Sequence, residues 1–202
     1  MDPDLQPRLD AQVKEAAKAQ FLHRGHLEGG VFSSDALGLT AEIQADTAAT
    51  VPPDGAELEL KRRGTHGRRQ TAALGGSIYF LFELLTTELE TEVTEKLARR
   101  VQPGAAGPVR VRASYAIKLS VGVVDVDEVE LEDDAEMKVA FVPACGGAAT
   151  LVLLGAWAGP QGDAATEQWF DRVRLDEAAP ACAYITAHAA PTAASAGAPS
   201  TE

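Results

Sequence analysis

The chain has 202 residues, of which 46% are hydrophobic and 24% are charged, and its formal net charge at pH 7 is -12. This composition excludes collagen-like, coiled-coil and disulfide-dense proteins, and the length suffices for one domain with its own core. The acidic balance disfavours general binding to nucleic acid, because a negative surface repels phosphates. Since no catalytic or cofactor-binding motif occurs, the sequence favours a non-enzymatic protein without a cofactor.

The first half of the chain predicts two helices and a hairpin. A helix over 3–24 begins with Pro3 at its first position and ends at Gly25. Residues 25–36 lack periodicity and predict a loop, whereas 37–45 alternate as a strand does. The following hairpin, 56–74, has Leu58 and Leu60 on one face. A second helix over 77–101 follows from apolar residues three or four positions apart, which are Ile78, Leu81, Phe82, Leu85, Leu89, Val93 and Leu97.

The second half predicts strands. Residues 108–124 alternate between apolar and polar side chains, as in an antiparallel sheet with one solvent-facing side. The acidic run 125–136 predicts a short edge strand or an exposed loop. Four further strands are expected, at 137–143, 149–157, 168–175 and 182–188. The sum is an α+β domain over 1–190, a largely antiparallel and possibly curled sheet of six to eight strands with both helices packed on it, followed by a disordered tail over 191–202.

The uncharged segment 139–159 has nearly the length of a membrane span. Pro143, Gly146 and Gly147 lie at its middle, which favours a buried hairpin over a continuous helix. A hairpin that inserts into a membrane is the second alternative to the main functional hypothesis. The only cysteines, Cys145 and Cys182, permit one disulfide. Because the N-terminus lacks the features of a secretory signal, we expect a cytoplasmic protein with reduced thiols.

A basic segment over 61–69 is the first candidate binding site. Like charges this close repel one another unless an anion lies among them. The segment therefore predicts a contact with an anion or an acidic partner, whereas the alternative is a solvated hairpin tip. Aromatic residues that would stack on nucleic acid bases are absent between the arginines. The candidate residues are Lys61, Arg62, Arg63, His66, Arg68 and Arg69.

An acidic rim within 125–136 is the natural complement of the basic segment. Pairing between copies predicts a homo-oligomer, and a head-to-tail contact would build a ring or filament. A calcium site is disfavoured because the run lacks the glycine of the calcium loop, and we expect no bound metal. The candidate residues are Asp125, Asp127, Glu128, Glu130, Glu132, Asp133 and Asp134.

A set of histidines and a predicted pocket offer other functions. His23, His26 and Glu28 form a compact set, but Gly25 breaks the helix between the histidines, so they are typical of a helix end rather than of a metal site. The first alternative function is a small-ligand-binding protein or enzyme with a pocket between the sheet and the helix 77–101. Binding or assembly through the charged segments is the main hypothesis.

Overall fold

The computed structural model describes residues 5–45, 47–62, 75–103, 108–131, 135–158 and 162–188. Its larger sheet has seven strands in the order β4-β5-β6-β10-β9-β8-β7, and all neighbours in it are antiparallel. The strands are β4 (Thr47–Thr50), β5 (Leu58–Arg62), β6 (Gly75–Leu81), β7 (Arg110–Leu119), β8 (Gly122–Glu130), β9 (Ala135–Ala144) and β10 (Ala149–Ala158). The α+β class and the antiparallel sheet predicted from the sequence are confirmed.

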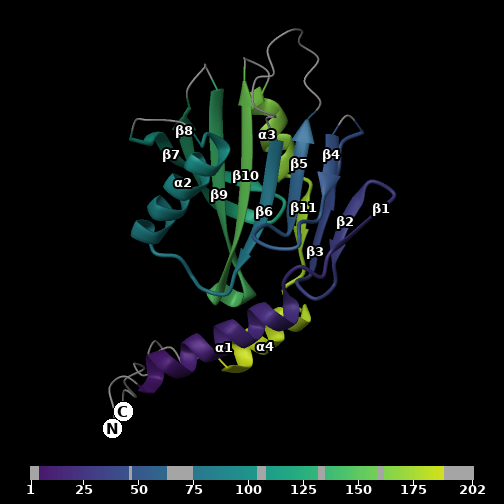
Figure 1. Ribbon diagram of the computed structural model, residues 1–202, viewed down its shortest axis with the longest axis vertical. Helices are drawn as coiled ribbons and strands as arrows, with labels where there is room; N and C mark the ends of the chain where they lie inside the picture. The colour runs from purple at the N-terminus through teal and green to yellow at the C-terminus, as the bar shows by residue number, and fades with distance from the viewer. Residues whose placement is uncertain are drawn as a thin grey trace, which may run out of the picture.

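A second, four-stranded sheet has the order β1-β2-β3-β11. Its strands are β1 (His26–Glu28), β2 (Val31–Ser34), β3 (Leu39–Glu42) and β11 (Val173–Leu175). The helices are α1 (Leu5–Phe21), α2 (Thr87–Val101), α3 (Gly162–Phe170) and α4 (Pro180–His188), and a short 3-10 turn, η1 (Cys145–Gly147), joins β9 to β10. Figure 1 shows α2 across one face of the large sheet and the pair α1 and α4 below both sheets.

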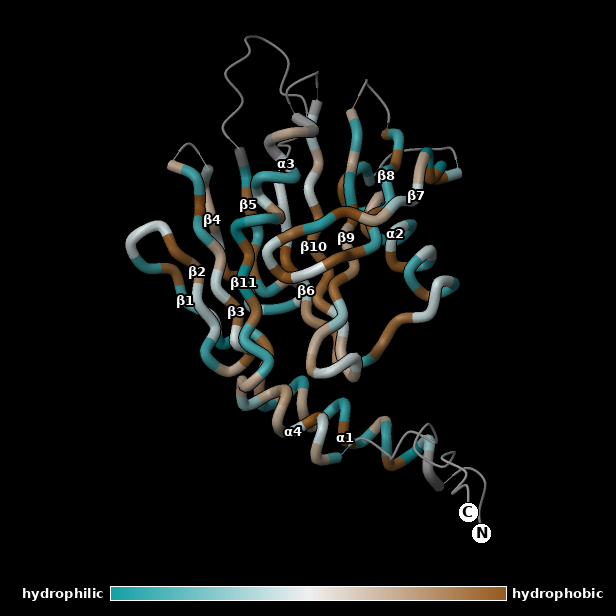
Figure 2. The backbone as a smooth tube through the Cα atoms, turned by 180° about the vertical axis from the view of Figure 1, so that it is seen from behind, coloured by the Kyte–Doolittle hydropathy of each residue, from teal (hydrophilic) through white to brown (hydrophobic). Residues whose placement is uncertain are grey.

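Hydrophobic side chains cover both faces of the large sheet at its centre. Met137, Val139 and Val152 belong to the cluster beneath α2, while Ala140 and Leu153 belong to a second cluster on the opposite face. Burial on both sides explains why β10, and β9 from Val139 onward, are apolar without alternation. Figure 2 shows the hydrophobic colouring of this hairpin. The predicted buried hairpin is therefore confirmed. In the described part of the chain, no helix is long and apolar enough to cross a membrane.

The predicted helix 77–101 is wrong in its first half. Gly75–Leu81 is strand β6, in which buried residues, among them Ile78 and Phe80, alternate with partly exposed ones. Six residues of β6 pair with β10, and the helix begins only at Thr87. The segment is ambiguous in sequence because Ile78, Phe80 and Phe82 fit the period of a strand while Ile78, Leu81, Phe82 and Leu85 fit that of a helix.

Of the two C-terminal strands predicted from the sequence, 182–188 is entirely helix and 168–175 is a strand only in its last three residues. Residues 168–170 belong to α3, whose Thr166, Trp169 and Phe170 are buried at the i, i+3, i+4 spacing of one helix face, and only 173–175 form a strand. Residues 182–188 lie in α4, which buries Cys182 and Ile185.

The acidic run is not at the edge of the sheet. Up to Glu130 it belongs to β8, which pairs with both β7 and β9. The predicted single strand 108–124 is divided by a turn at Ser120 and Val121 into β7 and β8, so β7 is the edge strand. The predicted loop 25–36 contains the hairpin β1–β2, which turns at Gly29 and Gly30, both with positive φ. The disordered tail predicted over 191–202 lies outside the described residues.

The prediction of reduced thiols is also wrong. Cys145 at the β9–β10 turn forms a disulfide with Cys182 in α4. Both side chains are buried. The bond therefore fixes the C-terminal helix to the end of the central hairpin, two parts of the chain 37 residues apart.

Candidate functional site

Two of the six basic candidate residues, Lys61 and Arg62, lie where β5 ends. Lys61 is exposed near the end of β5, and Arg62 is the last residue of the strand, in register with Thr47 of β4. Lys61 also pairs across the sheet with Gly75, the first residue of β6. Arg63, His66, Arg68 and Arg69 lie outside the described residues, between these two strands.

The acidic candidate residues do not form one surface. Strand alternation places Asp125 and Asp127 on the face covered by α2, where the Thr94 hydroxyl donates to Asp127 Oδ2 over 2.9 Å. Burial raises the pKa of Glu90 on α2, and the charges of Asp125 and Asp127 raise it further. The predicted rim therefore includes a local cluster of like charges beneath α2.

Glu128 and Glu130 point to the opposite face of β8. Arg112 Nη1 lies 2.6 Å from Glu136 Oε1 and 3.6 Å from Glu128 Oε1. Glu130 is exposed and pairs in register with Glu136. Glu132, Asp133 and Asp134, the remaining members of the rim, lie outside the described residues, between β8 and β9.

Lys138 lies on that face and is a buried cation. It is not among the candidate residues predicted from the sequence. Its Nζ lies 2.6 Å from Glu167 Oε1 of α3 and within 6 Å of the ring centroids of Tyr115 and Trp157. A buried charge requires such partners. The group joins α3 to the sheet, and its only sequence signal is a lone lysine inside an apolar strand.

The two charged segments emerge from the same end of the large sheet. Because all neighbouring strands are antiparallel, the end of β5, the start of β6, the end of β8 and the start of β9 lie at one end. Three strands, β6, β10 and β9, separate β5 from β8. At about 4.8 Å per strand, the two strand ends are about 19 Å apart.

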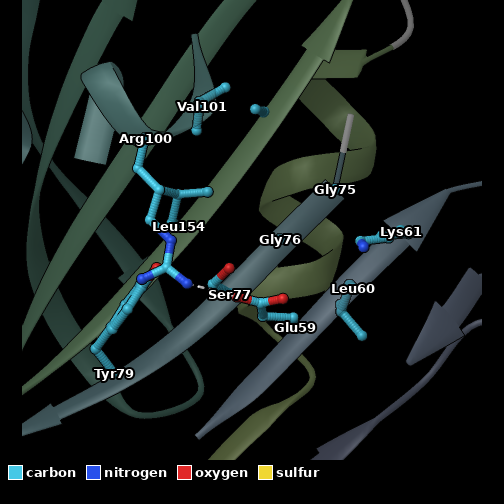
Figure 3. A pocket seen from close by; sticks show the side chains of 11 residues that line it. Glu59, Leu60, Lys61, Gly75, Gly76, Ser77, Tyr79, Arg100, Val101 and Leu154 are labelled. Atoms are coloured by element: carbon cyan, nitrogen blue, oxygen red, sulfur yellow. Dashed lines mark hydrogen bonds and ion pairs between the residues drawn. The ribbon is translucent and has the colours of Figure 1, made fainter. Parts of the chain in front are cut away.

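A cleft of about 170 Å³ lies beside the basic strand end, between β5, β6, β10 and the C-terminal turn of α2. Figure 3 shows the Arg100 side chain reaching from α2 across β6. Its Nη2 lies 2.8 Å from Glu59 Oε1, and its Cζ lies 5.9 Å from the centroid of the Tyr79 ring. The lining residues are Glu59, Leu60, Lys61, Gly75, Gly76, Ser77, Tyr79, Arg100, Val101, Leu154 and Ala156.

The hydroxyl of Tyr79 is a hydrogen-bond donor at neutral pH. Burial raises its pKa above the ordinary value, although the charge of Arg100 and a hydrogen bond with Ser77 oppose this rise. The sequence indicated part of the cleft, since Glu59 and Lys61 alternate with the buried Leu58 and Leu60. It did not indicate Arg100, which lies in the last turn of α2.

His23 lies against the buried carboxyl group of Glu57 rather than in a set with His26 and Glu28. The His23 backbone N–H donates to Glu57 Oε2 over 2.9 Å, and His23 Nδ1 lies 3.4 Å from Glu57 Oε1. His26 and Glu28 are exposed on β1. Among the described residues, no group of three or more His, Cys, Asp and Glu side chains could hold a metal ion.

Glu57 makes stability depend on pH in a direction that can be tested. Burial raises the pKa of Glu57 above its ordinary value of 4.5. Between pH 4.5 and the raised pKa of Glu57, the folded chain holds more protons than the unfolded chain. The contribution of Glu57 to stability is therefore full below pH 4.5 and is lost as the pH rises through the raised pKa. We expect the stability of the wild type relative to Glu57→Gln to fall as the pH rises from 4 to 8.

Urea denaturation of the two proteins at several pH values measures this difference. The exposed Glu92→Gln variant controls for the loss of one carboxylate. A gap between wild type and Glu57→Gln that stays constant across the range would refute the assignment to Glu57.

Comparison with known proteins assigns the chain to no family. No family model and no curated protein matches it. Among solved structures, the chain is similar to the solution structure of cyanobacterial PsbP (CyanoP) from Synechocystis sp. PCC 6803, with a TM-score of 0.48 and 10% sequence identity. The alignment covers 69% of this chain and 87% of that one. This degree of similarity assigns neither a family nor a function to the chain.

Proposed function

We propose that the protein functions by binding other copies of itself. In this self-association, the basic segment of one copy pairs with the acidic residues at and after the end of β8 in another copy. The observation that supports this proposal is that the strand ends next to the two charged segments, those of β5 and β8, lie at one end of the large sheet. Lys61 and Arg62 end β5, and Glu130 ends β8. Arg63, Arg68 and Arg69 follow the first strand end in sequence, and Glu132, Asp133 and Asp134 follow the second.

The position of the segments favours a two-fold dimer over the head-to-tail ring or filament. Rotation by 180° about an axis perpendicular to the sheet brings the charged ends of two copies together and reverses the strand order of one of them. Each β5 end then faces the β8 end of the other copy, so both contacts join opposite charges. A contact of this kind uses the same surface on both copies and closes at two.

Pairing through charged residues makes such a dimer sensitive to salt. Exposed charges attract one another over a Debye length of about 8 Å at physiological ionic strength and about 3 Å at 1 M salt. We therefore expect a native mass near twice the chain mass of 21.2 kDa in dilute buffer, and a mass near 21.2 kDa in high salt. Light scattering after size exclusion measures both.

Reversal of charge tests the basic segment. The variant Arg62→Glu/Arg63→Glu is expected to have the monomer mass at both salt concentrations. The matched control is Arg8→Glu/Arg24→Glu, which makes the same change in net charge at two exposed positions, in α1 and just after it. A dimer that persists in the first variant, or one that is lost equally in both, would contradict the proposal.

A further inference from the structure

The cleft beside Arg100 has the form of a small ligand site. On the face of the sheet that α2 covers, β6 carries Gly75 and Ser77 and β10 carries Ala156, so small residues leave a hollow where neighbouring positions carry large side chains. Arg100 and Val101 of α2 close one side. The resulting volume of about 170 Å³ suits a group the size of a small ion rather than a large cofactor.

Two cations from different elements face this hollow. Arg100 comes from α2 and Lys61 comes from β5 (Figure 3). Glu59 Oε1 occupies one nitrogen of the Arg100 guanidinium, which has five N–H donors in all. The Arg100 side chain is 53% exposed, so its other donors are open to solvent or to a ligand. With one carboxylate against two cations, the lining carries a net positive charge in a chain whose overall charge is negative.

We propose that this cleft binds a phosphate group, held by Arg100 and Lys61 and by the hydroxyls of Ser77 and Tyr79. Donors that approach from the helix, from β5 and from the floor of the cleft suit the tetrahedral oxygens of phosphate better than the planar oxygens of a carboxylate. Glu59 competes with the ligand for Arg100. The site shares Lys61 with the basic segment, but it uses neither Arg62 nor Arg63, the two residues changed in the test of self-association.

Titration with inorganic phosphate at constant ionic strength, followed by the amide NMR signals of the protein, tests the proposal. We expect saturable shifts at Gly75, Gly76 and Ser77. Arg100→Gln should weaken phosphate binding at least about tenfold, because it removes charge-assisted hydrogen bonds. The matched control is Arg99→Gln, which removes the neighbouring exposed arginine of α2, paired with Glu95 outside the cleft.

Two further variants keep the test independent of any loss of folding. Lys61→Gln, at an exposed strand position, should also weaken phosphate binding. Glu59→Gln should strengthen it severalfold, since removal of a competing carboxylate frees the guanidinium, and misfolding does not produce a gain in affinity. Absence of saturable binding up to about 10 mM phosphate, or equal affinities in wild type, Arg100→Gln and Lys61→Gln, would overturn the proposal.

A second pair of titrations identifies the source of the phosphate. Glycerol 3-phosphate represents a soluble ester, and vesicles that contain phosphatidic acid represent a lipid headgroup. Binding of the soluble ester that depends on Arg100 assigns a free metabolite. Vesicle binding that depends on Arg100, without affinity for the soluble ester, assigns a headgroup. If binding to neither probe depends on Arg100, the assignment to a phosphate ester is overturned.

Discussion

Replacement of both Cys145 and Cys182 by alanine is expected to lower the free energy of unfolding by about 2–4 kcal/mol. The disulfide joins positions 37 residues apart, so its loss allows the unfolded chain many more conformations. In the folded chain it holds α4 against the β9–β10 turn, where the Gly146 N–H also donates to Glu177 Oε2 over 2.8 Å. Urea denaturation of the wild type and the double variant without reductant measures the difference.

Reductant provides the control for this prediction. Reduction of the wild-type protein should lower its stability to about that of the alanine double variant, whereas the variant itself should not respond. Equal stability of the oxidised wild type and the variant would show that the disulfide does not stabilise the chain.

Gly155→Ala is the second substitution for which we expect a large effect. A Cβ atom at position 155 would clash with Cγ2 of Thr166, because α3 packs directly on the backbone of β10. Neither the centre of a seven-stranded sheet nor a buried helix face can move freely, so we expect a loss of about 1–3 kcal/mol in the free energy of unfolding. Thermal or urea unfolding measures this loss.

A double-mutant cycle assigns the effect to the contact with α3. Thr166→Ser removes the methyl group that the new Cβ would meet. The combined variant Gly155→Ala/Thr166→Ser should therefore lose less free energy of unfolding than the sum of the two single losses. Additive effects would mean that the cost of Gly155→Ala arises elsewhere.

The sequence predicts strands well where one face differs from the other or where a turn interrupts an apolar run. Alternation marks β7, and Pro143, Gly146 and Gly147 mark the central hairpin. Prediction from the sequence fails at β6, where the apolar residues fit both the period of a strand and that of a helix. Only pairing with β10, a contact between distant parts of the chain, decides between the two.

The candidate site is less predictable than the fold because its parts are distant in sequence. Glu59 and Arg100 are 41 residues apart, and they meet only because α2 packs across the sheet with its C-terminal end over β5 and β6. Composition identified the two charged segments, but not that the strands leading into them end at the same end of the sheet, which follows from the strand order. Similarly, nothing local to Cys145 or Cys182 indicates that they meet.

The most direct test of the proposed self-association mixes two charge-reversed variants. The two variants are Arg62→Glu/Arg63→Glu/Arg68→Glu/Arg69→Glu and Glu132→Lys/Asp133→Lys/Asp134→Lys. Each should show the monomer mass of 21.2 kDa in dilute buffer, since each reverses the net charge of one segment and so places like charges at the contact. In an equimolar mixture both contacts of a two-fold dimer again join opposite charges, so light scattering should show about twice that mass. A mixture that stays at the monomer mass, while the wild type forms a dimer, would contradict the pairing of these two segments.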